Sequence, residues 1–319
     1  MNAASEGESR DGVALTNLDQ PLFDGAEATK RDLVDYLDRM ADRILPVLRG
    51  RPLSVIRVHR GQDAFMQKNV PRSTPDWVRT VRIWSESSKR DVDYALCDDR
   101  RTLLWFANQR AVEYHPTLVR ADRPDRATHI VLDLDPPASG GFAMAVHAAH
   151  LVRRALADAG LDGVAKTSGA KGVHVFVPID RRATIDEAAA ATRAIAERAA
   201  RLEPEIATTA FMKADRRGRV FVDSTRAGGA TVAAAYGPRV RPGTPVSFPV
   251  RWEELDAISP GDYTIRTVPD RLGDRDPWAE LMPRPQRLPG ALIAEGRAIP
   301  TARVQAMHEG RRRAREGRG

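Results

Sequence analysis

The spacing of apolar residues predicts a helix near the start of the chain and short strands after it. From residue 29 to 48, large apolar side chains recur at helical spacing, with Asp32 in the first turn and Gly50 after the last. We therefore expect one amphipathic helix over this segment. Stretches rich in strand-forming residues follow at 53–58, 78–84 and 94–96, and an apolar patch lies at 103–106.

A regular alternation of strands and helices begins at Thr128. Helices are expected at residues 142–159 and after Thr184, where Thr184 and Glu187 have the spacing of a capping box. The strands around them are expected at residues 129–135, 163–166, 172–179 and 219–223. This β-α-β-β-α-β order is that of the split βαβ motif of RRM and ferredoxin-like folds. The predicted fold class is α+β, with an N-terminal α/β subdomain packed on the split βαβ module.

The domain boundaries follow from this order and from local composition. We expect the N-terminal subdomain to cover residues 13–127 and the split βαβ module to cover residues 128–290. Residues 1–12 are polar, and residues 291–319 end in a run of arginines. We expect residues 1–12 to be disordered and residues 291–319 to form a basic, flexible tail.

Composition restricts the class of protein. The chain is 42% hydrophobic and 29% charged, which is typical of a soluble globular protein. A single cysteine, Cys97, excludes an intramolecular disulfide and a cysteine-rich zinc site. No apolar run has the length of a membrane span, and the N-terminus does not resemble a signal peptide, so a cytoplasmic protein is expected. The formal net charge of +7 favours a polyanionic partner such as DNA.

The first candidate for chemistry is the pair Asp133 and Asp135 at the end of an expected strand. Side chains two apart on a strand share a face, so both carboxylates point away from the side of Leu132 and Leu134. Adjacent carboxylates repel each other, and a hard divalent cation such as Mg²⁺ or Mn²⁺ relieves that repulsion. The alternative is that both are solvated at a strand end.

A third carboxylate, Asp223, ends another apolar strand. An acidic residue directly after Val220, Phe221 and Val222 is unusual without a partner. We take Asp223 as a third metal ligand, and the alternative is a simple strand terminator.

A glycine-containing turn joins two of the expected strands. Gly169 and Gly172 flank Lys171 there, and glycine lets the backbone offer its amide groups to phosphate oxygens. Ser168 and Lys171 add a hydroxyl and a positive charge, which suggests a triphosphate cradle. His174 alternates with valines and therefore points to the face of the carboxylates. A solvated turn is the alternative.

These residues resemble the signatures of the archaeo-eukaryotic primase superfamily, most closely those of the polymerase domain of bacterial ATP-dependent ligase D, over roughly residues 14 to 282. The three signatures are Asp133-Leu-Asp135, Ser168-Gly-Ala-Lys-Gly-Val-His174 and Val220-Phe-Val-Asp223. Further matching segments are Leu15-Thr-Asn17, Arg49-Gly-Arg-Pro-Leu53, Phe65-Met-Gln-Lys68, Pro75-Asp-Trp-Val78, Ala107-Asn-Gln109 with His115, Ala234-Ala-Tyr236 with Arg239, and Asp276-Pro-Trp278.

The resemblance implies a primase-polymerase that works by a two-metal mechanism. It implies that Asp133, Asp135 and Asp223 hold two Mn²⁺ or Mg²⁺ ions. The residues that it places at the incoming nucleotide or beside the active site are Ser168, Lys171, His174, His115, Arg239 and Arg216. The residues that it places at the DNA are Asn17, Lys30, Arg57, Phe65 and Lys68.

The resemblance also implies a substrate and a setting. Such enzymes add dNTPs or NTPs to primer 3′ ends on gapped, nicked or overhanging DNA during end joining or excision repair. No ligase or nuclease domain is recognised in the chain, so a stand-alone monomer is expected, nucleoid-associated in the cytoplasm, with a DNA ligase and Ku as partners in trans. Gln20 departs from the basic residue usual at its position, which implies a weaker grip on a downstream 5′-phosphate.

Two other functions fit part of the pattern. An aspartyl-nucleophile phosphatase also has Asp-x-Asp after an apolar strand, but it requires a parallel sheet, and Pro136 follows the second aspartate here. A nonenzymatic nucleic-acid-binding module would need only the basic charge, and it would leave the complete set of three acidic residues unexplained.

Overall fold

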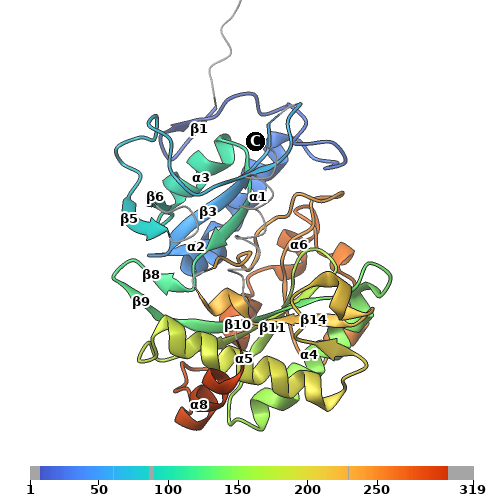
Figure 1. Ribbon diagram of the computed structural model, residues 1–319. Coiled ribbons are helices and arrows are strands. Elements are labelled where there is room, and N and C mark those ends of the chain that lie inside the picture. Colours follow the sequence, from blue (N-terminus) through green and yellow to red (C-terminus); the bar gives the residue numbers. More distant parts are fainter. Residues whose placement is uncertain (1–7, 60, 86–89, 229, 301–319) are drawn as a thin grey trace, which may run out of the picture.

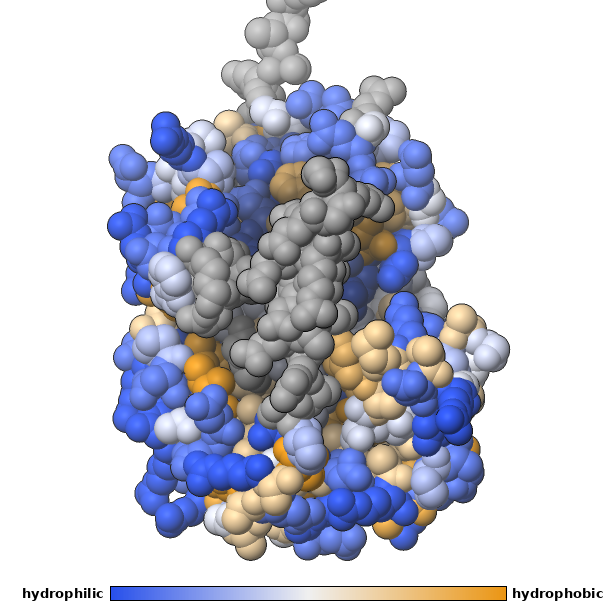
Figure 2. Space-filling model, viewed as in Figure 1, coloured by the Kyte–Doolittle hydropathy of each residue, from blue (hydrophilic) through white to orange (hydrophobic). Residues whose placement is uncertain are grey.

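The computed structural model describes residues 8–59, 61–85, 90–228 and 230–300. The N-terminal elements form one part of the molecule, and a broad sheet covered by two long helices forms the other (Figure 1). We call these the N-terminal part and the central sheet. On the face seen in Figure 2, hydrophilic side chains predominate among the described residues, and apolar side chains form smaller patches between them.

The central sheet carries the split βαβ motif. Its strands are β10 (His129–Asp135), β11 (Val164–Thr167), β12 (Val173–Pro178), β13 (Ala207–Thr208), β14 (Val220–Asp223) and β15 (Pro249–Val250). Within the described residues the strand order is β13-β14-β10-β12-β11-β15, and every pairing is antiparallel except that of β13 with β14. The inner order β14-β10-β12-β11 confirms the predicted split βαβ arrangement.

Two long helices cover one face of this sheet. They are α4 (Gly141–Ala157) and α5 (Ile185–Leu202), and both lie below the sheet in Figure 1. Helix α5 begins with the predicted capping box, in which Thr184 accepts from the Glu187 amide and the Glu187 carboxylate accepts from the Thr184 amide. The helix-covered face buries Leu132 and Leu134 in the main core. The opposite face, which includes Val131, is turned away from these helices.

The N-terminal part combines a second sheet with short helices. Its elements are β1 (Ser9–Arg10), β2 (Val13–Ala14), α1 (Lys30–Arg39), α2 (Ala41–Leu48), β3 (Pro52–Arg57), β4 (Phe65–Gln67), β5 (Thr80–Ser85), β6 (Arg90–Leu96), α3 (Arg100–Asn108), β7 (Ala111–Pro116), β8 (Val119–Arg120) and β9 (Arg123–Ala127). Strand β3 pairs with β4, β6 and β7, and all of these pairings are antiparallel. The predicted strands correspond to β3, β5 and β6.

After β14 the chain returns to the N-terminal part. The Ala234 amide donates to the Tyr114 carbonyl at 2.8 Å, and the Tyr36 hydroxyl donates to the Tyr236 carbonyl at 2.7 Å. One continuous apolar core therefore runs through both parts. The remaining helices are the 3₁₀ turns Lys213–Arg216, Thr225–Gly228, Leu255–Ala257 and Pro260–Asp262, and the α-helices α6 (Val268–Leu272), α7 (Pro277–Leu281) and α8 (Gly290–Ala298). Among the residues described, none of these or the other helices combines the length and apolar character needed to cross a bilayer.

Two local expectations differ from the structure. The single helix expected at 29–48 is two helices, because the chain leaves helical geometry at Met40 (φ −93°, ψ 2°). The apolar spacing did not reveal this break, because the buried residues of α1 and α2 continue one helical spacing across Met40. The apolar patch at 103–106 is the buried face of α3, whose start is capped by Asp99.

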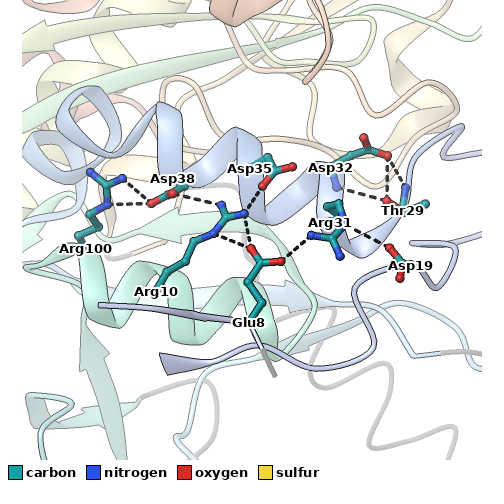
Figure 3. A network of polar contacts seen from close by, with 9 residues as sticks. All are labelled: Glu8, Arg10, Asp19, Thr29, Arg31, Asp32, Asp35, Asp38 and Arg100. Carbon is teal, nitrogen blue, oxygen red and sulfur yellow. Dashed lines mark hydrogen bonds and ion pairs between the residues drawn. The ribbon is translucent and has the colours of Figure 1, made fainter. Parts of the chain in front are cut away.

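The expectation that residues 1–12 are disordered is wrong for residues 8–12. Strand β1 pairs with β2, and Arg10 lies between Glu8, Asp35 and Asp38 at N–O distances of 2.5, 2.6 and 3.1 Å (Figure 3). Glu8 also accepts from Arg31 at 2.6 Å. A single exposed ion pair stabilises little, but this network ties the polar segment to α1. Residues 1–7 lie outside the described residues.

The expectation that the tail begins at residue 291 is also wrong, because α8 packs against α5. Gly296 is the reason the two helices approach so closely: a Cβ there would lie 1.8 Å from the Ala190 carbonyl oxygen. Composition alone did not reveal this contact, and the segment contains few large apolar residues. Residues 301–319, with the terminal arginines, lie outside the described residues.

Gly296→Ala should destabilise the protein by about 1–3 kcal/mol, because its new methyl group overlaps the α5 backbone. Gly290→Ala is the matched control, since a Cβ at Gly290 meets nothing within 4 Å. Urea unfolding of both variants checks this expectation. A Gly296→Ala protein as stable as the Gly290→Ala protein would show that α8 is not closely packed.

Candidate active site

The three predicted carboxylates lie at one end of the central sheet. Asp133 on β10 is directly opposite Asp223 on β14, and Asp135 follows two residues later on the same strand. Asp133 and Asp223 are only 7% and 5% exposed, whereas Asp135 is half-buried. The β10–β14 register therefore brings the three acidic side chains to one face of the sheet, as their sequence pattern predicts.

His174 joins this group from the other neighbour of β10. It lies opposite Asp133 in the β10–β12 ladder, and its Nε2 is 3.2 Å from Asp133 Oδ1. Its Nδ1 is 2.8 Å from Nζ of the fully buried Lys166, which also donates to Ser247 Oγ at 2.5 Å. When the amine donates to Nδ1, the ring proton lies on Nε2 and faces Asp133. Burial and the neighbouring Lys166 lower the pKa of His174 to about 4.

A residue that the sequence did not single out, Arg226, neutralises part of this acidic group. Its Nη2 is 3.0 Å from Asp133 Oδ2 and 3.5 Å from Asp223 Oδ2. Burial opposes ionisation of Asp133, but His174 and Arg226 outweigh it and hold its pKa well below the usual value. Asp135 lacks such a contact, and burial together with Asp133 raises its pKa to about 6.

The chemistry of this group fits divalent cations, although the side chains are not arranged around an ion. Among the described residues, no three His, Cys, Asp or Glu side chains are gathered closely enough to hold a metal ion as they stand. Arg226 supplies the positive charge between Asp133 and Asp223 instead. Carboxylate oxygens are the ligands that Mg²⁺ and Mn²⁺ prefer, and Arg226 would have to move away from Asp133 and Asp223 for such ions to bind.

The glycine-containing turn lies beside the carboxylates, as expected. A Cβ on Gly172 would lie 2.6 Å from the Leu134 carbonyl oxygen, so only glycine lets the turn approach β10 this closely. The Ser168 hydroxyl accepts from the amides of Ala170 and Gly172 at 3.2 and 3.1 Å. These amides therefore organise the turn around Ser168, while the exposed Lys171 remains available for a phosphate.

Lys171 and Asp135 line a cavity of about 370 Å³ whose other charged residues are all basic. Arg216 contributes to it and stacks over the Phe221 ring at 3.9 Å. Lys213, which the sequence did not single out, also lines it. The cavity combines one carboxylate with several cations, which is suited to a polyphosphate held beside a metal.

A buried glutamate that the sequence analysis missed connects His115 to Arg239. Glu113 Oε2 is 2.7 Å from His115 Nε2 and 3.0 Å from Arg239 Nε, and its Oε1 accepts from the Val240 amide at 2.8 Å. Arg239 in turn donates to the Ser168 carbonyl. Glu113 therefore links β7 of the N-terminal part to the glycine-containing turn. The signal was available, because Glu113 and His115 are two apart on a strand and share a face.

Three residues predicted to contact DNA lie at or next to β4, an edge strand of the N-terminal sheet, where Arg57 on β3 is opposite Phe65. Arg57 donates to Gln67 Oε1 and to the Gln109 carbonyl, both at 2.8 Å, and its guanidinium is 5.9 Å from the centre of the Phe65 ring. Phe65 is 39% exposed, and Lys68 is partly buried close by on the chain. This group shares no direct contact with the carboxylates among the described residues.

The last two predicted DNA contacts differ in accessibility. Asn17 is exposed and has a left-handed backbone (φ 53°). Lys30 is only 3% exposed, and its Nζ donates to the Thr16 carbonyl at 2.5 Å and to Asn108 Oδ1 at 2.7 Å. Burial and nearby Arg110 lower the pKa of Lys30 to about 8. Lys30 therefore holds the loop of Asn17 in place, and its ammonium is largely engaged.

The sheet also bears on one of the alternatives left open by the sequence, the phosphatase. An aspartyl-nucleophile phosphatase needs its Asp-x-Asp strand in a parallel sheet. Strand β10 is antiparallel to both of its neighbours. The phosphatase alternative is therefore wrong.

Comparison with known proteins agrees with this geometry. The model of the LigD primase-polymerase domain matches residues 29–278. The bifunctional non-homologous end joining protein LigD of Bacillus subtilis is 33% identical over 289 residues, which are 88% of this chain and 46% of that protein. The multifunctional LigD of Pseudomonas aeruginosa is 35% identical over 303 residues, 91% of this chain and 35% of that protein. The chain thus spans less than half the length of these relatives.

A solved structure matches over nearly its whole length. It is titled as the polymerase domain of Mycobacterium tuberculosis ligase D in complex with DNA. The TM-score is 0.77 at 32% identity, and the match covers 84% of this chain and 97% of that one. The similarity therefore extends to both parts of the fold.

Fold, site and comparisons together define the class of protein: this is a nucleotidyltransferase of the primase-polymerase type. Polymerase domains of this kind are in general metal-dependent. The chain belongs to the LigD primase-polymerase domain family.

Glu113→Gln removes a charge whose contribution to the free energy of unfolding depends on pH. Burial opposes ionisation, but His115 and Arg239 hold the pKa of Glu113 at about 2, below its usual 4.5. Because this pKa is lowered in the folded protein, the ionised Glu113 stabilises the fold above pH 4.5, and that stabilisation is lost as the pH falls through about 2. The variant should therefore be less stable at pH 7, by up to roughly 3 kcal/mol, and the difference should shrink in acid.

Urea unfolding of wild type and variant at a series of pH values measures this difference. Glu205→Gln removes an exposed glutamate and serves as the control, with little change expected at any pH. A pH-independent difference for Glu113→Gln would mean that its charge is not what stabilises the contact.

Proposed function

We propose that this protein adds dNTPs or NTPs to primer 3′ ends, filling short gaps or processing broken ends in DNA repair by end joining or excision repair. The observation that carries the proposal is the convergence of Asp133, Asp135 and Asp223 beside His174 and a basic cavity. The relatives named for non-homologous end joining support the choice of process.

In the proposed reaction, the primer 3′-hydroxyl attacks the α-phosphorus of the nucleotide and pyrophosphate leaves. The three carboxylates would hold two Mn²⁺ or Mg²⁺ ions, which would supply positive charge to stabilise the phosphoryl transfer. Lys171 and Arg216 neutralise the triphosphate in the cavity beside Asp135. His174 donates from Nε2, and the contact of its Nδ1 with Lys166 fixes that orientation.

Binding of the nucleotide also depends on residues from the N-terminal part. His115 and Arg239 contact the nucleotide in this proposal, and Glu113 holds both in position. Ser168 maintains the turn that presents Lys171. Buried contacts thus hold His115 and Arg239 before substrate arrives, which lowers the cost of ordering these two side chains during the reaction.

DNA is the proposed partner, since the matching solved structure is of a complex with DNA. The exposed Phe65 provides an aromatic surface for a template base, and Arg57 and Lys68 provide charge for the backbone. Asn17 and Lys30 lie together at the proposed site for a downstream 5′-phosphate. A monomer associated with the nucleoid, with a DNA ligase and Ku acting in trans, completes the proposal.

The double variant Asp133→Asn with Asp135→Asn should abolish nucleotide addition, at least a thousandfold, because the remaining Asp223 cannot hold two cations. Extension of a labelled primer on gapped DNA with Mn²⁺ or Mg²⁺ measures it. Asp274→Asn, at an exposed position between α6 and α7, is the control and should extend normally. Undiminished extension by a folded double variant would refute the polymerase assignment.

Gln20→Lys should strengthen recognition of a downstream 5′-phosphate. Gln20 is exposed, and its carbonyl accepts from the Lys30 amide at 2.9 Å, so a lysine there adds a charge next to the proposed site. We expect about a fivefold to tenfold gain in affinity for gapped DNA with a 5′-phosphate over DNA without it. Fluorescence anisotropy with both DNAs measures the ratio. An equal gain for both DNAs would show general charge attraction and no phosphate site.

A further inference from the structure

A second cavity lies on the same face of the central sheet as the candidate active site. It has a volume of about 150 Å³ and is lined by His129 at the beginning of β10. His129 is four positions before Asp133 on this strand, which is roughly 13 Å at strand spacing. The apolar side chains of Val131 and Phe176 lie between the two ends. The cavity is therefore a space separate from the candidate active site.

Several segments far apart in sequence form its walls. Helix α2 contributes Pro46 and Val47, and strand β12, which pairs with β10, contributes Phe176. Leu118, Val232 and Trp278 add further apolar surface. The cavity thus lies where the N-terminal part meets the central sheet, and most of its wall is apolar.

The charged groups in this cavity are all basic. Arg51 is 7% exposed, and its Nη1 donates to the Thr117 carbonyl at 3.1 Å and to Thr128 Oγ1 at 2.8 Å. Among the described residues, no protein atom accepts from Nε or Nη2 of Arg51 or from the guanidinium of Arg120. No aspartate or glutamate lines the cavity. Two guanidinium groups therefore lie here with unused donors and no neutralising carboxylate.

The electrostatic surroundings agree with this geometry. Burial, with the charges of Arg120 and Arg181, lowers the pKa of Arg51 to about 10. Burial, with Arg51 and Arg120, lowers the pKa of His129 to about 3. Arg181 is already paired with Asp122 at 2.8 Å, which leaves Arg51 and Arg120 facing each other's charge. An anion in the cavity would relieve that repulsion.

We propose that this cavity binds a small phosphate-class anion, with a phosphoryl group held by Arg51 and Arg120. Guanidinium groups present paired donors that match phosphate oxygens, and burial strengthens such charge-assisted bonds. The volume is suited to a phosphoryl group with a small apolar substituent. The apolar walls formed by Phe176 and Trp278 would contact that substituent.

Isothermal titration calorimetry of the full chain with inorganic phosphate and with phenyl phosphate tests this proposal. We expect binding of at least one probe, and Arg120→Gln should weaken it at least tenfold. Tighter binding of phenyl phosphate would identify an organic phosphate, and equal or tighter binding of inorganic phosphate would identify the free ion. Arg120 is chosen because it makes no contact that the fold requires, whereas loss of Arg51 would remove several buried hydrogen bonds.

Two further variants separate this cavity from other phosphate sites. Lys171→Gln alters the candidate active site and should leave binding unchanged, and so should Arg72→Gln, at an exposed position. His129→Gln, inside the cavity, should weaken binding in the same direction as Arg120→Gln. Loss of binding in Lys171→Gln with wild-type binding in Arg120→Gln would overturn the proposal, as would absence of binding of either probe to the wild-type chain.

Discussion

The pairing register of β10 with both of its neighbours is the constraint on which the candidate active site depends. Asp133 lies opposite His174 on one side and Asp223 on the other. Because side chains alternate along a strand, a slip of one residue would turn the imidazole or the third carboxylate to the helix-covered face. Burial of Leu132 and Leu134 against α4 and α5 prevents that slip. The apolar residues between the carboxylates thus fix the position of the polar ones.

Buried charges hold the N-terminal part to this sheet. Glu113 pairs with His115 and Arg239, and Arg239 reaches the carbonyl of Ser168 in the glycine-containing turn. A buried ion pair adds little net stability, but removal of one partner leaves the other charge unpaired at a cost of about 3–5 kcal/mol. The contact therefore mainly specifies how the N-terminal part packs on the sheet, because few other placements of that part would leave the Glu113 carboxylate with its partners.

Sequence reasoning predicted the parts of the structure that local rules determine. The strand 129–135, the shared face of Asp133 and Asp135, and the capping box at Thr184 all follow from spacing alone. It did not predict Arg226 at the carboxylates, the burial of Lys30, or the contact of α8 with α5. Each of these depends on segments brought together by the tertiary fold, and no periodicity in the chain records them. Glu113 is intermediate, since its spacing from His115 was visible but its burial was not.

The face of the central sheet opposite α4 and α5 is polar at both ends and apolar in the middle. Carboxylates lie at one end, whereas Arg51 and Arg120 lie at the other, beyond Val131 and Phe176. His129 and Asp133 are four positions apart on β10, so roughly 13 Å of strand separates the cavity from the carboxylates. The register of β10 that brings the carboxylates together thus also brings His129 to the wall of the cavity, so one strand contributes side chains to both places.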